Sequence, residues 1–206
     1  MHPTKAGRSA SRIHAAVLLA AVVAVTLVSP AFAHEGAGVA GGFASGFKHP
    51  ILGWDHVAAM VAVGLWGAFL GAPGIWLLPI VFPLVMALGG GLGIAGLPLP
   101  GVEVGIAASA VVLGIMIALG ARPPLWVAAI IVGAFAIFHG HAHGTELPAA
   151  ADALAYAIGF VLGTGLLHLV GITLGVATRW EAGKVAVRAA GGAIAIAGLA
   201  FLTGMA

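Results

Sequence analysis

Long apolar runs, each of about 20 residues, follow one another along most of this chain, and roughly that length is needed for a helix to cross a membrane. Short segments rich in glycine and proline, such as "GAPG", "GLPLPG", "GARPP" and "ELP", separate the runs and are typical of turns. The pattern predicts six transmembrane helices, at residues 50–71, 75–96, 102–121, 124–143, 150–176 and 184–204.

The composition excludes a soluble domain. Only 7% of the 206 residues are charged and 62% are hydrophobic, whereas soluble domains carry about 25% charged residues. The connections between the runs are too short to hold a soluble domain. The sequence therefore predicts an all-α integral membrane protein built as one compact bundle of six helices.

The N-terminal segment has the features of a cleaved signal peptide. Three basic residues precede an apolar run over 15–28, and small residues lead up to Ala33. We predict a leader over 1–33 and a membrane domain over 34–206; the alternative is an uncleaved additional helix. Without the leader, five basic residues remain against six acidic ones, so the charge balance predicts no nucleic-acid partner.

The basic residues also predict an orientation. With an exported N-terminus, the connections on the inner side carry Arg122, Arg179 and Lys184, whereas the outer side carries only Lys48. This asymmetry follows the positive-inside rule. We therefore expect a multi-pass protein of the bacterial cytoplasmic (inner) membrane, in contact with lipid, whose mature N-terminus lies outside.

Histidines gather at the predicted outer ends of the helices. Six of the seven that follow the leader are found there: His34, His49, His56, His139, His141 and His143. They occur in three segments, "HEG", "KHPILGWDHVAAM" and "FHGHAHGTE". Only His168 stands apart, within the fifth span. Ionisable residues inside a membrane are costly and mark ion pathways or functional sites.

Helical spacing relates the polar residues of the first span. At 100° per residue, His56 and Met60 each point within about 20° of His49. Pro50 suits the first turn of a helix, which would place His49 near the N-cap. Asp55 lies on another bearing, where it could hold an imidazole N–H or meet a neighbouring helix.

The fourth span carries a second stripe. His139, His143 and Glu146 are spaced i, i+4 and i+7 if the helix continues that far, whereas His141 points nearly the opposite way. The two glycines of "HGHAHG" are also four residues apart, and small residues at this spacing let another helix approach closely.

These observations predict a cation site formed by the first and fourth spans. Its predicted ligands are His49, Asp55, His56, His139, His143 and Glu146. Weaker candidates are His34, Met60, Glu103, His141 and His168. Each weaker candidate has a structural alternative, such as an interhelical hydrogen bond for His168, packing for Met60 and an interfacial charge for Glu103.

The ligand types limit the ion. Imidazole with carboxylate suits borderline divalent metals such as nickel, cobalt or zinc, and the chain has no cysteine to supply a thiolate. The metal would be a transported substrate, with no prosthetic group expected. The chain has no P-loop for a nucleotide; the membrane potential alone supplies about 4.6 kcal/mol per 100 mV for a divalent ion.

The segments "HPILGWDHVAAMVAVGLW" and "FHGHAHGTELP" resemble those of the HupE/UreJ family of nickel and cobalt permeases, and the resemblance extends over essentially the whole chain. The first family motif falls on His49, Asp55 and His56. The second falls on His139, Gly140, Ala142, His143, Gly144 and Glu146, with His141 at its variable position. The resemblance implies uptake of nickel or cobalt for hydrogenase or urease maturation, and no enzymatic activity; it leaves a homo-oligomer open.

Two other functions are compatible with the same residues. One is an intramembrane zinc-dependent hydrolase, with Asp55 or Glu146 as the base. The other is a metal sensor or chaperone that does not transport. A last expectation concerns symmetry: spans one and four begin the two halves, cross in opposite senses and each carry a histidine motif, as an inverted 3+3 repeat would.

Overall fold

A computed structural model describes residues 38–147 and 152–205, which form helices joined by turns. The predicted leader, its cleavage after Ala33 and the candidate ligand His34 lie outside the described residues. The helices are α2 (Gly38–Leu52), α3 (Trp54–Leu70), α4 (Gly74–Ile94), α5 (Val102–Leu119), α6 (Leu125–Thr145), α7 (Ala153–Gly175), the short 3-10 helix η1 (Val176–Arg179) and α8 (Glu181–Leu202).

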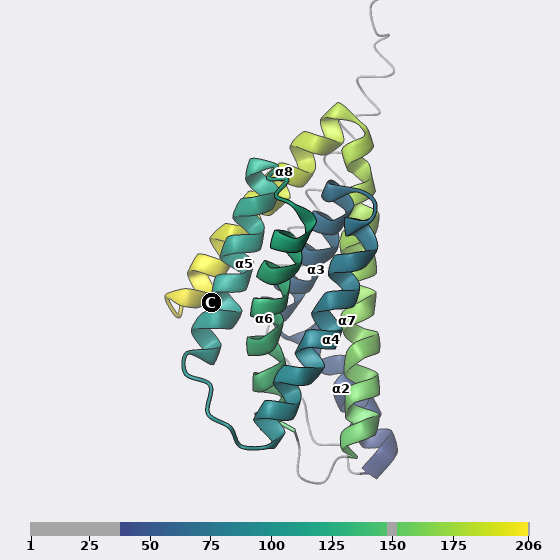
Figure 1. Ribbon diagram of the computed structural model, residues 1–206, viewed down its shortest axis with the longest axis vertical. Coiled ribbons are helices and arrows are strands. Elements are labelled where there is room, and N and C mark those ends of the chain that lie inside the picture. Colours follow the sequence, from purple (N-terminus) through teal and green to yellow (C-terminus); the bar gives the residue numbers. More distant parts are fainter. Residues whose placement is uncertain (1–37, 148–151, 206) are drawn as a thin grey trace, which may run out of the picture.

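The helices lie side by side along the long axis of the molecule (Figure 1). Five of them are long and apolar enough to cross a membrane: α4, α5, α6, α8, and α7 taken together with η1. They correspond to predicted spans two to six. Taken together, α2 and α3 are also long and apolar enough to cross a membrane, so counting this bent pair as one span gives a sixth. The prediction of an all-α membrane protein is therefore confirmed.

The predicted start of the first span is wrong. The chain does not enter a helix at Pro50; that residue lies inside α2, and His49 occupies the last turn of α2. The axes of α2 and α3 differ by 78°, with a break between the two helices. Gly53 at the break is extended, with φ −86° and ψ 115°. Proline has no N–H for the carbonyl of Gly46, which weakens α2 just before the break.

Glycines determine how closely the helices pack. On α6, a β-carbon at Gly140 would overlap the carbonyl of Met86, and one at Gly144 would overlap that of Gly90, so the backbones of α4 and α6 touch. This confirms the close approach predicted from the two glycines of "HGHAHG". Gly64 of α3 and Gly171 of α7 bring those two helices together in the same way.

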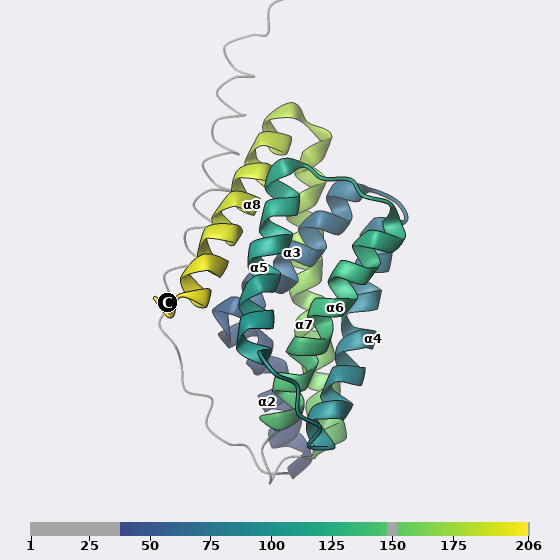
Figure 2. The same cartoon turned by 60° about the vertical axis from the view of Figure 1, so that its left-hand side comes forward.

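The two ends of the bundle differ in chemistry. At the lower end of Figure 1, α2 lies beside the start of α7 and near the ends of α4 and α6. The opposite end holds the turn before α6 and the η1 segment, and therefore Arg122 and Arg179. Figure 2 shows α8 against α5, at the edge of the bundle away from α4. The described histidines other than His168 thus lie at the end opposite most of the basic residues.

Candidate metal centre

The break between α2 and α3 places two histidines near each other. His49 lies in the last turn of α2 and His56 in the first turn of α3, and their ring centroids are 6.0 Å apart. A β-carbon at Gly53 would lie 3.0 Å from Nδ1 of His56 and 3.1 Å from Oδ1 of Asp55, which is tight. The glycine therefore leaves room for the pair that follows it. The proximity arises from the bend and not from the common helical face that we predicted.

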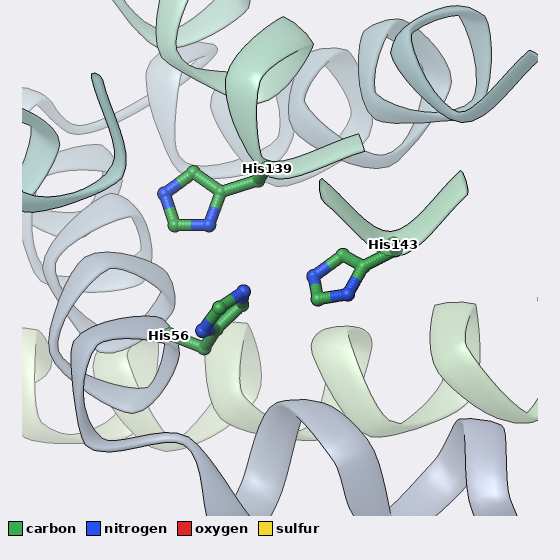
Figure 3. A group of neighbouring side chains, drawn as sticks. All are labelled: His56, His139 and His143. Atoms are coloured by element: carbon green, nitrogen blue, oxygen red, sulfur yellow. The ribbon is translucent and has the colours of Figure 1, made fainter. Parts of the chain in front are cut away.

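Three imidazoles converge between α3 and α6. The ring of His56 lies 4.9 Å from that of His139 and 4.6 Å from that of His143, measured between centroids. Figure 3 shows the three rings facing a common space, with His139 and His143 one turn apart on α6. All three are buried, and one nitrogen from each lies within 4.8 Å of the others. We call these residues the buried triad.

Asp55 fixes the tautomer of His56. Its Oδ1 accepts a hydrogen bond from the backbone N–H of His56 at 2.8 Å and lies 2.7 Å from Nδ1 of the same ring. An ionised carboxylate can only accept, so the proton resides on Nδ1. The lone pair is then on Nε2, which is buried and has no partner among the described residues. A carboxylate behind the ring in this way orients metal-ligating histidines.

Ser109 of α5 does the same for His139. Its hydroxyl donates to the carbonyl of Ile106 at 2.5 Å, and its oxygen lies 3.0 Å from Nε2 of His139. Because the hydroxyl proton is already used, the serine oxygen accepts from Nε2–H. The lone pair of His139 is then on Nδ1, which has no partner in the described part of the chain. The sequence analysis missed Ser109, although it is the only hydroxyl residue in α5.

A second group lies nearer the surface. His49 Nε2 is 3.4 Å from Oε2 of Glu146, and the rings of His49 and His143 are 4.7 Å apart. One atom each from His49, His143 and Glu146 lies within 4.8 Å of the others. The side chain of Glu146 is 52% exposed. We call these residues the mouth group; His143 belongs to it and to the buried triad.

The mouth group opens into a pocket of about 280 Å³. Five of the residues that line it are sequence-predicted candidates: His49, Asp55, His56, Glu103 and Glu146. Glu103, at the start of α5, lines this pocket without joining either group. Desolvation raises the pKa of the Glu146 carboxyl above its usual value, against the opposing effect of His56. Carboxylates thus surround the entrance, and imidazoles lie behind it.

Aromatic side chains of α7 enclose the other side. The ring of Phe160 lies 4.1 Å from that of His143, and the ring of Tyr156 lies 6.3 Å from that of His49. Both aromatic residues are buried. They exclude water from one flank of the histidines, which strengthens electrostatic interactions there.

Three remaining candidates lie outside both groups. The Nε2 of His141 lies 2.7 Å from the carbonyl of Leu97, in the connection between α4 and α5. Met60 is completely buried in the hydrophobic core. His168 lies on α7, and its ring centroid is 5.5 Å from that of Phe82. The structure therefore brings together all six main predicted ligands and adds Glu103 at the pocket, but leaves these three aside.

The donor set matches borderline divalent metals. Buried imidazole nitrogens with fixed lone pairs, next to carboxylate oxygens, are the ligands that nickel, cobalt and zinc accept. The hydrogen bonds that the oxygens of Asp55 and Ser109 accept from the ring N–H groups are typical of metal-ligating histidines. The geometry suits a transition-metal ion.

Comparison with known proteins agrees with this chemistry. The family model described as "HupE / UreJ protein" matches residues 20–201. The chain belongs to the HupE/UreJ family. The chain is also 47% identical over 179 residues to "Protein HupE" of Rhizobium leguminosarum bv. viciae. The aligned region covers 86% of this chain and 94% of that protein. No solved structure matches the chain significantly. Membership of this family of metal-transport and accessory proteins confirms the resemblance stated from the two motifs.

Proposed function

We propose that this protein is a permease that carries Ni²⁺ or Co²⁺ into the cell, with Zn²⁺ as the next candidate. The observation that supports it most is the pairing of an open and a buried ligand group that share His143. Metal that binds at the exposed Glu146 can reach the buried triad by exchanging ligands around His143. Such an exchange requires that each stage bind weakly enough to release the ion.

The charge distribution supports an outward-facing pocket. Arg122 and Arg179 lie at the end opposite the histidines, and the positive-inside rule assigns such residues to the cytoplasm. We propose that residues 1–33 are removed on export and that the protein resides in the bacterial inner membrane. Nickel or cobalt admitted there would serve the maturation of hydrogenase or urease.

The membrane potential is a sufficient driving force in this proposal. A divalent ion gains about 4.6 kcal/mol per 100 mV on entering a negative interior. This energy supports a concentration ratio of roughly a few thousand, since each 1.4 kcal/mol is a factor of ten. No nucleotide-binding domain is then needed.

Helix pairing supports an inverted 3+3 repeat. Exchanging the two halves of the chain converts the α3–α7 pair into the α6–α4 pair. Both pairs pack through glycines, Gly64 with Gly171 and Gly140 with the backbone of Met86 and Gly90. Both also adjoin the buried triad, which draws on α3 and α6. Metal sites at the interface of two inverted repeats are a known transporter arrangement.

The test is uptake of radioactive nickel or cobalt into vesicles that contain only this protein and carry an inside-negative potential. We expect accumulation by the unaltered protein, and His56→Ala to reduce it to the level of empty vesicles. His141→Ala is the matched control, because His141 is a buried histidine at the same end that contacts the Leu97 carbonyl instead of either group. This control should accumulate nearly as much metal as the unaltered protein.

The outcomes separate the alternatives. Metal that binds the purified protein but never accumulates in vesicles would refute transport and favour a sensor or chaperone. Normal uptake by His56→Ala would remove the buried triad from the mechanism.

A further inference from the structure

A second set of polar atoms lies deeper in the bundle, on α7. Thr164 and His168 are one helical turn apart, with exposed fractions of 0% and 2%. The Thr164 hydroxyl and both ring nitrogens of His168 make no hydrogen bond to any residue that the structure describes. Unsatisfied polar groups are costly inside a membrane protein, where water does not compensate for them. Their presence together calls for a ligand.

The contrast with His141 is informative. That histidine is also buried, and its ring is held by the carbonyl of Leu97. It therefore shows what a histidine with a structural hydrogen bond looks like in this fold. The His168 ring lies within reach of the Pro79 carbonyl, but no contact as well aligned as that of His141 holds either of its nitrogens among the described residues.

The facing helix, α4, offers a backbone oxygen at the same place. The carbonyl of Pro79 lies beside the His168 ring. In a regular helix this carbonyl would accept from the N–H of residue 83, but that residue is Pro83, which has none. The second proline thus frees the Pro79 oxygen. The His168 ring thus has the Pro79 carbonyl of α4 beside it and Thr164 one helical turn away on its own helix.

This point lies beyond the buried triad on the way to the basic end. The ring of Phe82 is 5.5 Å from that of His139 and 5.5 Å from that of His168, so one aromatic ring bridges the two histidines. Along α7, His168 is fifteen residues from the start of the helix at the histidine-rich end, or about 22 Å at 1.5 Å per residue. His139 is only six residues from the end of α6, about 9 Å.

We propose that His168, the Thr164 hydroxyl and the Pro79 carbonyl form a second, weaker site for the transported divalent cation. The proposal rests on the proposed function and adds the inner stage of the path. One nitrogen and two neutral oxygens suit a borderline divalent metal. This site has no carboxylate, whereas the buried triad is supported by Asp55. It therefore binds the ion less tightly and can release it toward the inner face.

The first test counts bound cobalt on the purified protein, without any gradient. Equilibrium dialysis with radioactive Co²⁺ should show a tighter class and a weaker class in the unaltered protein. His168→Ala and Thr164→Val should each remove the weaker class, whereas His56→Ala should remove the tighter one. The visible absorption of Co²⁺ should change in His168→Ala at high cobalt only. A single class in the unaltered protein would mean that water satisfies His168, and would overturn the proposal.

The second test measures cobalt uptake by vesicles. His168→Ala should lower the maximal rate at least tenfold and leave the half-saturating concentration within twofold of that of the unaltered protein. Unchanged uptake in this variant would overturn the proposal. The proposal would also be overturned if His168→Ala kept the weaker class of cobalt sites but changed how uptake responds to a pH gradient. That result would mean that His168 carries protons and not the metal ion.

Two controls keep the tests decisive. Thr173→Val makes the same substitution on α7 at an exposed position whose hydroxyl bonds the Leu169 carbonyl, and it should behave as the unaltered protein does. Thr164→Val nearly preserves shape, so it tests the site if His168→Ala fails to fold. If the unaltered protein binds both classes but accumulates no cobalt, the proposed transport fails while the second site stands.

Discussion

The two segments that supply the buried triad are built differently. On α6, His139 and His143 come from one continuous helix, and the helical repeat alone sets their separation. On the other side, His56 begins a helix directly after the break at Gly53. Its position depends on the bend and on the carboxylate of Asp55 behind the ring. The helical repeat fixes the spacing of the ligands on α6, whereas a break in the backbone and the carboxylate of the preceding residue fix the ligand on α3.

The largest effect should come from the carboxylate on the broken side. Asp55→Asn keeps the shape of the side chain but removes the charge that holds the His56 tautomer, so cobalt affinity should fall about 100-fold. Equilibrium binding to the purified protein measures this. Asp152→Asn is the matched control, because Asp152 caps α7 through the Ala155 N–H and asparagine caps equally well. Equal losses in the two variants would show a general effect of charge.

Loss of the hydroxyl on the continuous side should have a smaller effect. Ser109→Ala removes the acceptor for Nε2–H of His139, but α6 still holds the ring in place, so affinity should fall about tenfold. The visible spectrum of bound Co²⁺ should shift as well, because the imidazole can adopt the other tautomer. Ser45→Ala on α2 is the control. A loss as large as that of Asp55→Asn would mean that the two sides do not differ.

The smallest of the three effects should follow a change at the break itself. In Gly53→Ala the added methyl lies against Asp55 and His56, so both side chains must shift slightly. Cobalt affinity should fall less than about tenfold, as expected for a change in the residues that orient a ligand. Gly165→Ala on α7, where an added methyl meets nothing within 4 Å, should leave affinity unchanged. A larger loss in Gly165→Ala than in Gly53→Ala would contradict a positioning role for the break.

The same difference explains what the sequence could predict. Helices α4 to α8 follow from apolar runs bounded by glycine and proline, and the facing of His139 and His143 follows from their spacing. The helix α2 was missed because its sequence is rich in glycine, which disfavours helices in isolation. It forms because Gly42 and Gly46 let it lie directly against the start of α7.

Ser109 was missed for a related reason. A single serine in an apolar span has no spacing relation to the histidines of another helix, so only the packing of α5 beside α6 assigns it to His139. Glu103 could be suggested from its position at the start of a span, but its place at the pocket depends on the same packing. Both placements depend on which helices contact each other, and a single sequence does not reveal those contacts.

The sharing of His143 has a consequence for stoichiometry. A neutral imidazole has one lone pair, so His143 can coordinate only one ion at a time. Without it, the mouth group and the buried triad each retain only two of their three residues. Under the proposed function, occupancy of one group excludes full occupancy of the other, so a second ion should gain all three residues of the mouth group only after the first has moved on. Entry should be single-file and saturable, with a Hill coefficient of about one for loading at this end.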